Sequence, residues 1–276
     1  MLRRCRPLLG TFVEITATDE DAIEAAFEAI AQVHRLMSAH EADSDLSRIN
    51  RFAHLRAVEV HEWTAWTLER AIYWARQSDG AFDPVKAGIA ALRRHLIPHH
   101  PDQPQPDATD WTSLELRGRS VRLVRLACID LGGIAKGFAV DRAIETLKEA
   151  GCEQGLVNAG GDLGGFGAQP WPVTIVDPLT RSPIVEVQVA DRSLATSAGL
   201  RTGGELSFDH LGGPNGRWTS VSALATSACD ADALTKLVWA GGERLNSVLE
   251  TNGAKAIGIK ANGVVERVGM TAGLAA

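Results

Sequence analysis

Apolar residues along the chain recur with two different periods, one typical of strands and one typical of helices. Between Phe12 and Thr18 every second residue is apolar, which predicts a half-buried strand. From Asp19 to Met37 the spacing becomes helical, and Thr18 or Asp19 can cap that helix. The apolar stripe of this helix, which we expect in the core, comprises Ile23, Ala26, Phe27, Ile30, Val33 and Met37.

Further segments have the same helical spacing, namely Trp63–Ala75, Ile134–Ala150 and Asp230–Trp239. Polar loops separate them from the strand signals, and the clearest of these loops is the turn-forming stretch Ser78–Pro84. The residues expected to anchor the first of these helices are Trp63, Trp66, Ala71 and Trp74.

Strand signals come mostly in adjacent pairs. Leu114–Ile129 is typical of a hairpin, and Lys255–Arg267 predicts another around Asn262-Gly263, the favoured type I′ pair. The glycine-rich stretch Leu156–Gly167 is interpreted as one strand. Locally joined strands interrupted by single helices predict an α+β fold with largely antiparallel sheets and packed helices.

Composition and charge narrow the class of protein. The 276 residues are 45% hydrophobic and 22% charged, as in ordinary soluble domains. A net charge of -6 argues against a nucleic-acid partner or an anionic membrane surface. The basic start resembles a signal-peptide leader, but its apolar run ends at Glu14. We therefore expect a cytoplasmic protein with reduced thiols and no membrane span.

The stretch Ile129–Ala143, IDLGGIAKGFAVDRA, places charged residues in a glycine-rich and otherwise apolar segment. Among them are Asp130, Lys136 and Asp141. A glycine turn that opens a helix favours an anion, and a lysine in the first helical turns opposes the helix dipole unless an anion compensates. A solvated lysine on a helix surface also explains the spacing and is favoured by the spacing alone, so the pattern leaves both interpretations open.

Carboxylates recur beside small residues at Asp83, Asp130, Asp162 and Asp232. Each by itself is typical of a cap or turn residue. Together they could hold Mg²⁺, which takes few protein oxygens and completes its shell with phosphate and water. Thr235 lies three residues after Asp232 on a predicted helix, so their oxygens would share a face.

Motifs in one order across nearly the whole chain resemble the ApbE family of FAD:protein FMN transferases. The most specific of them is DLGGIAKGFAVD. The segments that carry the resemblance are LLGTFVEI, MSAHEADSDLSRIN, DGAFDP, IDLGGIAKGFAVDRA, LVNAGGD, LATSAG and SACDADALTK.

The resemblance implies a single domain over residues 1–276 with T-fold-like duplicated layers. It also implies Mg²⁺-dependent transfer of FMN from FAD to a Thr or Ser hydroxyl of an acceptor protein, with release of AMP. The alternatives are a degenerate homologue that binds FAD without transfer, and a pyrophosphatase in which water replaces the hydroxyl and yields FMN and AMP.

Site residues follow from the same resemblance. The backbone carbonyl of Gly133 and the side chains of Asp232 and Thr235 would bind the metal. Lys136 would offset phosphate charge, and Asp162 is our hypothesis for the group that accepts the hydroxyl proton. The flavin-nucleotide contacts implied are Leu9, His40, Ala81, Phe82, Asp83, Asp130, Lys136 and His210.

The chain departs from the family pattern at two places. Lys236 stands four residues after Asp232, where the family usually has a threonine. The block His210–Arg217 reads HLGGPNGR and lacks the expected aspartate. A lysine beside Asp232 would compete with Mg²⁺, which is what motivates the non-transferring alternative.

Overall fold

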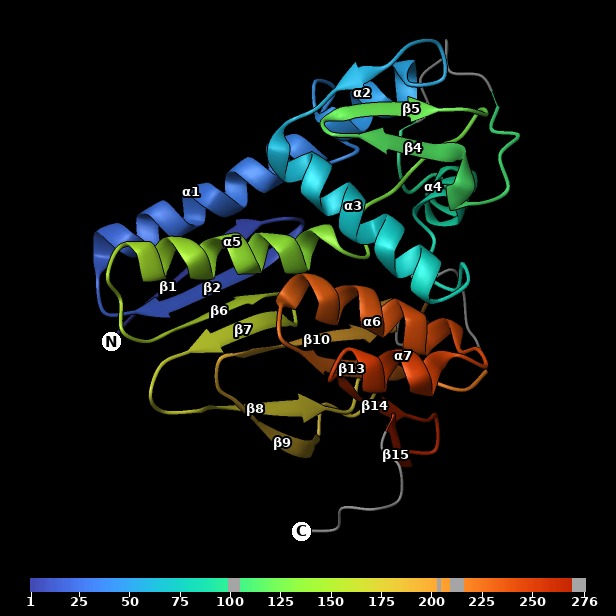
Figure 1. Ribbon diagram of the computed structural model, residues 1–276. Coiled ribbons are helices and arrows are strands. Elements are labelled where there is room, and N and C mark those ends of the chain that lie inside the picture. The colour runs from blue at the N-terminus through green and yellow to red at the C-terminus, as the bar shows by residue number, and fades with distance from the viewer. Residues whose placement is uncertain (99–104, 203–204, 209–215, 270–276) are drawn as a thin grey trace. The chain divides into compact units, whose positions relative to one another are not determined.

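The computed structural model describes residues 1–98, 105–202, 205–208 and 216–269, and the chain forms two compact units (Figure 1). The first unit joins Met1–Ala31 to Lys136–Ala276, and the second is Gln32–Ala135. Strand pairs in both units are antiparallel. The predicted α+β class with antiparallel sheets is therefore confirmed.

An eight-stranded sheet forms the centre of the first unit. The predicted strand near residues 12–18 is β2, and its apolar face is fully buried. The sequence pattern missed β1, because this edge strand has no clean alternation. In spatial order the strands are β1 (Leu2–Leu8), β2 (Thr11–Ala17), β6 (Gly155–Ala159), β7 (Asp162–Phe166), β10 (Arg192–Ala198), β13 (Ser220–Ala225), β14 (Lys255–Ile259) and β15 (Val265–Val268).

Helices α5 (Ala135–Glu149) and α6 (Ala228–Ala240) lie along one face of this sheet (Figure 1). Glycines make room for them. A side chain at Gly164 of β7 would lie 2.4 Å from Ile144 of α5. Helix α7 (Leu245–Thr251) packs beside α6 and β14. Close helix–sheet packing thus brings the start of α5 and the buried face of α6 over the same strands.

The opposite side of the sheet carries a separate hairpin, β8 (Trp171–Val176) and β9 (Pro183–Val189). Leu163, Ile175 and Val189 belong to the apolar cluster beneath it. A short ribbon of β11 (Leu200–Thr202) and β12 (Glu205–Ser207) completes the strands described in this unit.

The second unit is mostly helical. The predicted helix near residues 63–75 is present as α3, and the hairpin predicted from Leu114 is present but ends at Leu123 instead of Ile129. The first helix, α1 (Glu20–Met37), runs across the boundary between the units and buries its predicted stripe. The remaining elements are α2 (Asp45–Phe52), β3 (Val58–Glu59), α3 (Glu62–Gln77), α4 (Pro84–Arg93), a 3-10 turn (Trp111–Ser113), β4 (Leu114–Arg117) and β5 (Ser120–Leu123).

The interpretation of Leu156–Gly167 as one strand is wrong. Gly160 and Gly161 have φ values of 66° and 101°, and the chain reverses there so that Ala159 pairs with Asp162. Two adjacent glycines with positive φ form a tight hairpin turn at little steric cost. Asp162 consequently lies at the first position of β7.

Two smaller predictions are also wrong. Trp66 is 45% exposed, because the buried stripe of α3 follows Thr64, Leu68, Ala71 and Ala75. The terminal hairpin has a five-residue loop between Ile259 and Val265, closed by backbone hydrogen bonds of Lys260, so it is no two-residue type I′ turn. Among the residues that the structure describes, no helix combines the length and hydropathy needed to cross a bilayer.

Candidate functional site

Hydrogen bonds from the side chains and backbone of the second unit hold the glycine-rich stretch before α5. The Asn50 side chain both donates to the Ile129 carbonyl (3.0 Å) and accepts from the Ile129 N–H (2.8 Å). The Asp130 N–H donates to the carbonyl of Pro84, and the Asp130 carboxylate accepts from the Gly132 N–H at 3.1 Å. Local polar pairing therefore fixes this stretch up to the helix start.

Four charged side chains of the first unit form what we call the charge cluster: Lys136, Asp162, Asp232 and Lys236. Lys136 Nζ lies 2.5 Å from Asp162 Oδ2 and 3.7 Å from Asp232 Oδ2. Lys236 Nζ lies 2.7 Å from Asp232 Oδ1. The side chains of Asp162 and Asp232 are 3% and 0% exposed, whereas those of Lys136 and Lys236 are 33% and 23% exposed. The lysine side chains are thus the more accessible members of the cluster.

The close crossing of α5 and α6 creates this arrangement. Gly137 has no side chain, and a Cβ there would lie 2.1 Å from the carbonyl oxygen of Ala228. The Gly137 N–H donates to Asp232 Oδ2 at 3.3 Å. One turn later on α5, Asp141 accepts hydrogen bonds from the first two N–H groups of α6, at 2.7 and 2.8 Å. Each helix therefore supplies a carboxylate that caps the start of the other.

Neighbouring charges decide the protonation of the cluster. Burial alone would lower the pKa of Lys136, but the carboxylates of Asp232 and Asp162 outweigh it and raise that pKa well above its ordinary value. Burial also favours the neutral form of Asp232, yet the ammonium groups of Lys136 and Lys236 lower its pKa. Lys136 consequently remains a cation, and Asp232 an anion, at neutral pH.

Asp162 differs from Asp232 in the direction of its shift. Burial, followed by the negative charge of Asp232, raises the pKa of Asp162 against the opposing charges of Lys136 and Lys236. A carboxylate with a raised pKa is suited to exchanging a proton nearer neutral pH.

The ammonium of Lys236 is fully hydrogen bonded. Its three hydrogens are matched by Asp232 Oδ1 at 2.7 Å, Ser197 Oγ at 2.7 Å and Thr235 Oγ1 at 3.0 Å. The Thr235 hydroxyl donates to the backbone carbonyl of Asp232, so Ser197 must be the donor in its 2.7 Å contact with Thr235. Ser197 and Lys236 therefore belong to the site, although the sequence marked Ser197 only as part of the motif LATSAG.

The residues predicted to bind Mg²⁺ do not fit that ion as they are arranged. Both oxygens of Asp232 have ammonium or N–H partners, and the Thr235 hydroxyl is used within the same network. No grouping of three or more His, Cys, Asp or Glu side chains suited to a metal occurs within the described ranges. Gly133 belongs to the second unit, whereas Asp232 and Thr235 belong to the first.

In the second unit, Asp83 of the predicted flavin-binding turn is the N-cap of α4. Its carboxylate accepts from the N–H groups of Val85, Lys86 and Trp111 at 2.9 to 3.1 Å, and Lys86 Nζ lies 3.7 Å away. Burial raises the pKa of Asp83 above its usual value, although these N–H groups and Lys86 oppose the shift. The local contacts account for this aspartate as a cap.

The other predicted flavin contacts occupy varied settings. Leu9 forms the β1–β2 turn with φ 55°, an uncommon conformation for a residue with a side chain. His40 is exposed between α1 and α2, and Phe82 is buried next to Asp83. Ala81 and Asp130 are partly exposed. His210 lies outside the described residues.

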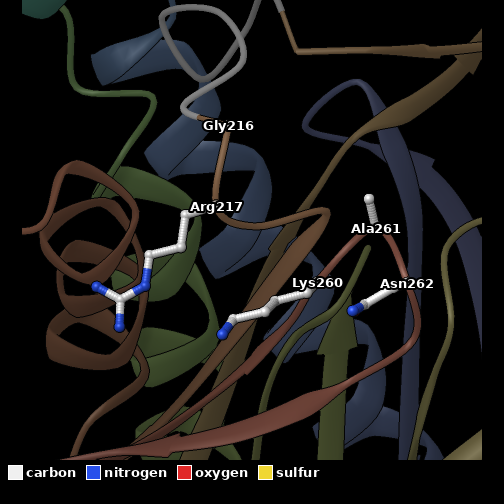
Figure 2. Close-up of a pocket in the computed structure, with 5 residues that line it drawn as sticks. All are labelled: Gly216, Arg217, Lys260, Ala261 and Asn262. Carbon is white, nitrogen blue, oxygen red and sulfur yellow. The ribbon is translucent and has the colours of Figure 1, made fainter.

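Another hollow of the first unit is lined by Gly216, Arg217, Lys260, Ala261 and Asn262 (Figure 2). Its two cations both bind Glu266, at 2.5 and 2.8 Å, and lower the pKa of that carboxyl. None of these lining residues was predicted as a site residue, and the cations are already paired. The charge cluster is therefore the stronger candidate.

The chain was also compared with known proteins. The family model described as the ApbE family matches residues 9–257. The FAD:protein FMN transferase of Treponema pallidum is 30% identical to the chain, and the match covers 77% of this chain and 69% of that protein. The enzyme of the same name from Haemophilus influenzae is 26% identical, with coverages of 86% and 78%.

Solved structures agree with the fold. The ApbE protein of Thermotoga maritima superimposes with a TM-score of 0.83 at 25% identity, covering 97% of this chain and 96% of that one. The flavin transferase ApbE of Vibrio cholerae gives a TM-score of 0.80 at 24% identity, with 96% of each chain covered.

Proposed function

Because the chain belongs to the ApbE family, we propose that it is a FAD:protein FMN transferase, which moves FMN from FAD to a threonine or serine hydroxyl of an acceptor protein. The observation that carries the proposal is the family match over residues 9–257. The charge cluster supports it, because partly exposed ammonium groups backed by buried carboxylates suit the oxygens of a pyrophosphate.

In the proposed reaction the acceptor oxygen attacks the phosphorus of the FMN half of FAD. The bond from that phosphorus to the bridging oxygen breaks, and AMP leaves with the bridging oxygen. Such phosphoryl transfers depend mainly on positioning and on neutralising negative charge. The hydroxyl proton passes to a carboxylate, for which Asp162 is our candidate because its pKa is raised.

Lys136 would neutralise a phosphate oxygen of bound FAD. Its raised pKa keeps it charged, and a charge-assisted hydrogen bond of this kind is worth about 1.5–3 kcal/mol. The Lys136→Met variant should therefore bind FAD about 10- to 100-fold more weakly. Flavin fluorescence quenching measures this, and an unchanged Kd would remove Lys136 from the binding site.

The general test mixes the protein, FAD and a pool of peptides in which threonine or serine is flanked by randomised residues. Covalent flavin on a peptide, with AMP released in equal amount, is the expected result. Bound but intact FAD with unmodified peptides would indicate a binding protein instead. Free FMN and AMP without labelled peptide would indicate a pyrophosphatase.

Asp162 has two candidate roles, to accept the hydroxyl proton or to orient Lys136, and a separate measurement distinguishes them. If it accepts the proton, Asp162→Asn removes the acidic limb of the pH–rate profile while the Kd for FAD changes little. If it only orients Lys136, the affinity for FAD falls and the shape of the profile is retained.

The flavin contacts predicted in the second unit and the Mg²⁺ requirement stay predictions. A bound Mg²⁺ would offset the negative charge of the pyrophosphate. The contacts of Asp232 give no support for placing the ion there, so no step above passes through it.

A further inference from the structure

Lys236 provides a positive charge at the place where the sequence predicts a metal. Its ammonium is surrounded by one carboxylate oxygen and two hydroxyl oxygens, from Asp232, Ser197 and Thr235. Carboxylate oxygens and neutral oxygens are also the ligands that Mg²⁺ prefers. Here the group among these oxygens is the ammonium of Lys236, which lies one helical turn after Asp232 in the same helix.

The charge balance of the cluster also disfavours a divalent cation beside Asp232. Two lysines and two aspartates give it no net charge. A divalent cation added beside Asp232 would leave two uncompensated positive charges next to two buried carboxylates, and like charges at such distances repel strongly where water is scarce. Mg²⁺ could bind Asp232 Oδ1 only after displacing the Lys236 ammonium at 2.7 Å.

The lysine side chains of the cluster are more exposed than Asp232. Asp232 is fully buried, but the side chain of Lys236 is 23% exposed and that of Lys136 is 33% exposed. A pyrophosphate carries negative oxygens on both phosphates, and it would meet two ammonium groups while their carboxylate partners stay behind them. Hydrogen bonds to Ser197 and Thr235 hold the second ammonium in one orientation.

We infer that the Lys236 ammonium replaces a divalent cation at Asp232, so that flavin transfer by this protein does not require Mg²⁺. Transfer without Mg²⁺ rests on the proposed function. The exclusion of a metal from Asp232 does not depend on activity. Lys236 then supplies positive charge beside the pyrophosphate of FAD, and Ser197 is a positioning residue that acts through it.

The first experiment measures transfer with and without a chelator. The wild-type rate in EDTA should equal the rate in Mg²⁺ within about twofold. Lys236→Thr frees Asp232 Oδ1 and removes one positive charge, so its rate in EDTA should fall about 100-fold, the loss typical for one group that stabilises transition-state charge. Added Mg²⁺ should restore most of that loss. Lys236→Met, which offers no oxygen in place of the ammonium, should regain less.

The second experiment measures metal binding alone. Mn²⁺, followed by its electron paramagnetic resonance signal, should not bind the wild-type protein at this site but should bind Lys236→Thr with one-to-one stoichiometry. Lys255→Thr, on an exposed strand position, is the matched control and should behave as wild type. Thermal melting of each variant shows that it is folded.

The outcomes separate the inference from the proposed function. A wild-type protein that transfers flavin only with Mg²⁺, or binds Mn²⁺ as tightly as Lys236→Thr, overturns the inference and leaves the transferase intact. If no variant transfers flavin under any condition, the proposed function is wrong, and the Mn²⁺ measurement still decides whether Lys236 excludes a metal from Asp232.

Discussion

Two aspartates, Asp83 in the second unit and Asp232 in the first, are both buried but have opposite pKa shifts. Asp83 accepts three backbone N–H groups and its pKa is raised by burial. Asp232 accepts one backbone N–H, but its pKa is lowered because two ammonium groups outweigh its burial. Full charges, more than the number of hydrogen bonds, thus decide which buried carboxylate stays ionised.

Asp141 extends the comparison within the first unit. Like Asp83 it is held by backbone N–H groups, those that begin α6, and burial raises its pKa to about 7 despite these bonds. Asp83 and Asp141 are therefore helix caps, whereas Asp232 is a counter-ion for lysines that reach solvent. Asp83 has one exposed lysine, Lys86, at 3.7 Å, whereas Asp232 has two lysines beside it.

The largest effect is expected from Asp232→Asn. Removing the anion leaves the Lys236 ammonium without its charge partner, and breaking a buried pair costs about 3–5 kcal/mol. Because both lysines are partly exposed, we expect about 3 kcal/mol in urea unfolding. The exposed Asp21→Asn on α1 is the control and should stay within about 0.5 kcal/mol. Equal stability of the two variants would contradict the counter-ion role.

Gly137→Ala tests the helix crossing that places Asp232. In an ordinary helix this change stabilises by about 1 kcal/mol, but here the new Cβ would lie 2.1 Å from the Ala228 carbonyl. We expect a net loss of about 2 kcal/mol from overpacking. Gly88→Ala in α4, with a Cβ 2.3 Å from the Cys128 carbonyl, is the matched case in the second unit. A stabilised Gly137→Ala would mean that the two helices do not meet this closely.

Asp83 should tolerate a neutral replacement that Asp232 does not. Asparagine keeps the N-cap acceptor but places its NH₂ against the Trp111 N–H, so Asp83→Asn should cost about 1–2 kcal/mol, as should Asp83→Ala. The measurement is again urea unfolding at neutral pH. If Asp83→Asn were as damaging as Asp232→Asn, the distinction between cap and counter-ion would fail.

The last prediction is a pH dependence of stability that comes from Asp141. Its folded pKa of about 7 exceeds the ordinary value of 3.8, so between these values the folded state binds the proton more readily than the unfolded state. Stability should therefore fall as the pH rises through this window, by up to about 1.4 kcal/mol per pH unit, and level off above it. Asp141→Asn should lack this contribution, and an identical slope in both proteins would assign it elsewhere.

Much of the fold follows from local pattern. The stripe of α1, the alternation of β2 and the hairpin of β4 and β5 were predicted correctly, because one buried face imposes a period that the sequence must carry. The misread glycines at 160 and 161 show the limit of this approach, since glycine marks both tight turns and close packing.

The site was predicted in part. Lys136, Asp162 and Asp232 were named from the sequence and do meet in the structure. Lys236 was noticed only as a departure from the family pattern, and Ser197 and Asp141 were given no role in the site. Their contacts join strands and helices that are far apart along the chain, as in the 39-residue separation between Ser197 and Lys236.

The sequence by itself determined some of the helices and strands, such as α1 and β2, and which family the chain resembles, because periodicity and motif order are properties of neighbouring residues. Only the tertiary structure decided that Asp232 receives two ammonium groups and Asp83 three backbone N–H groups. Charge–charge energy depends on distances in space and on the exclusion of water, and neither quantity is written in the order of the residues.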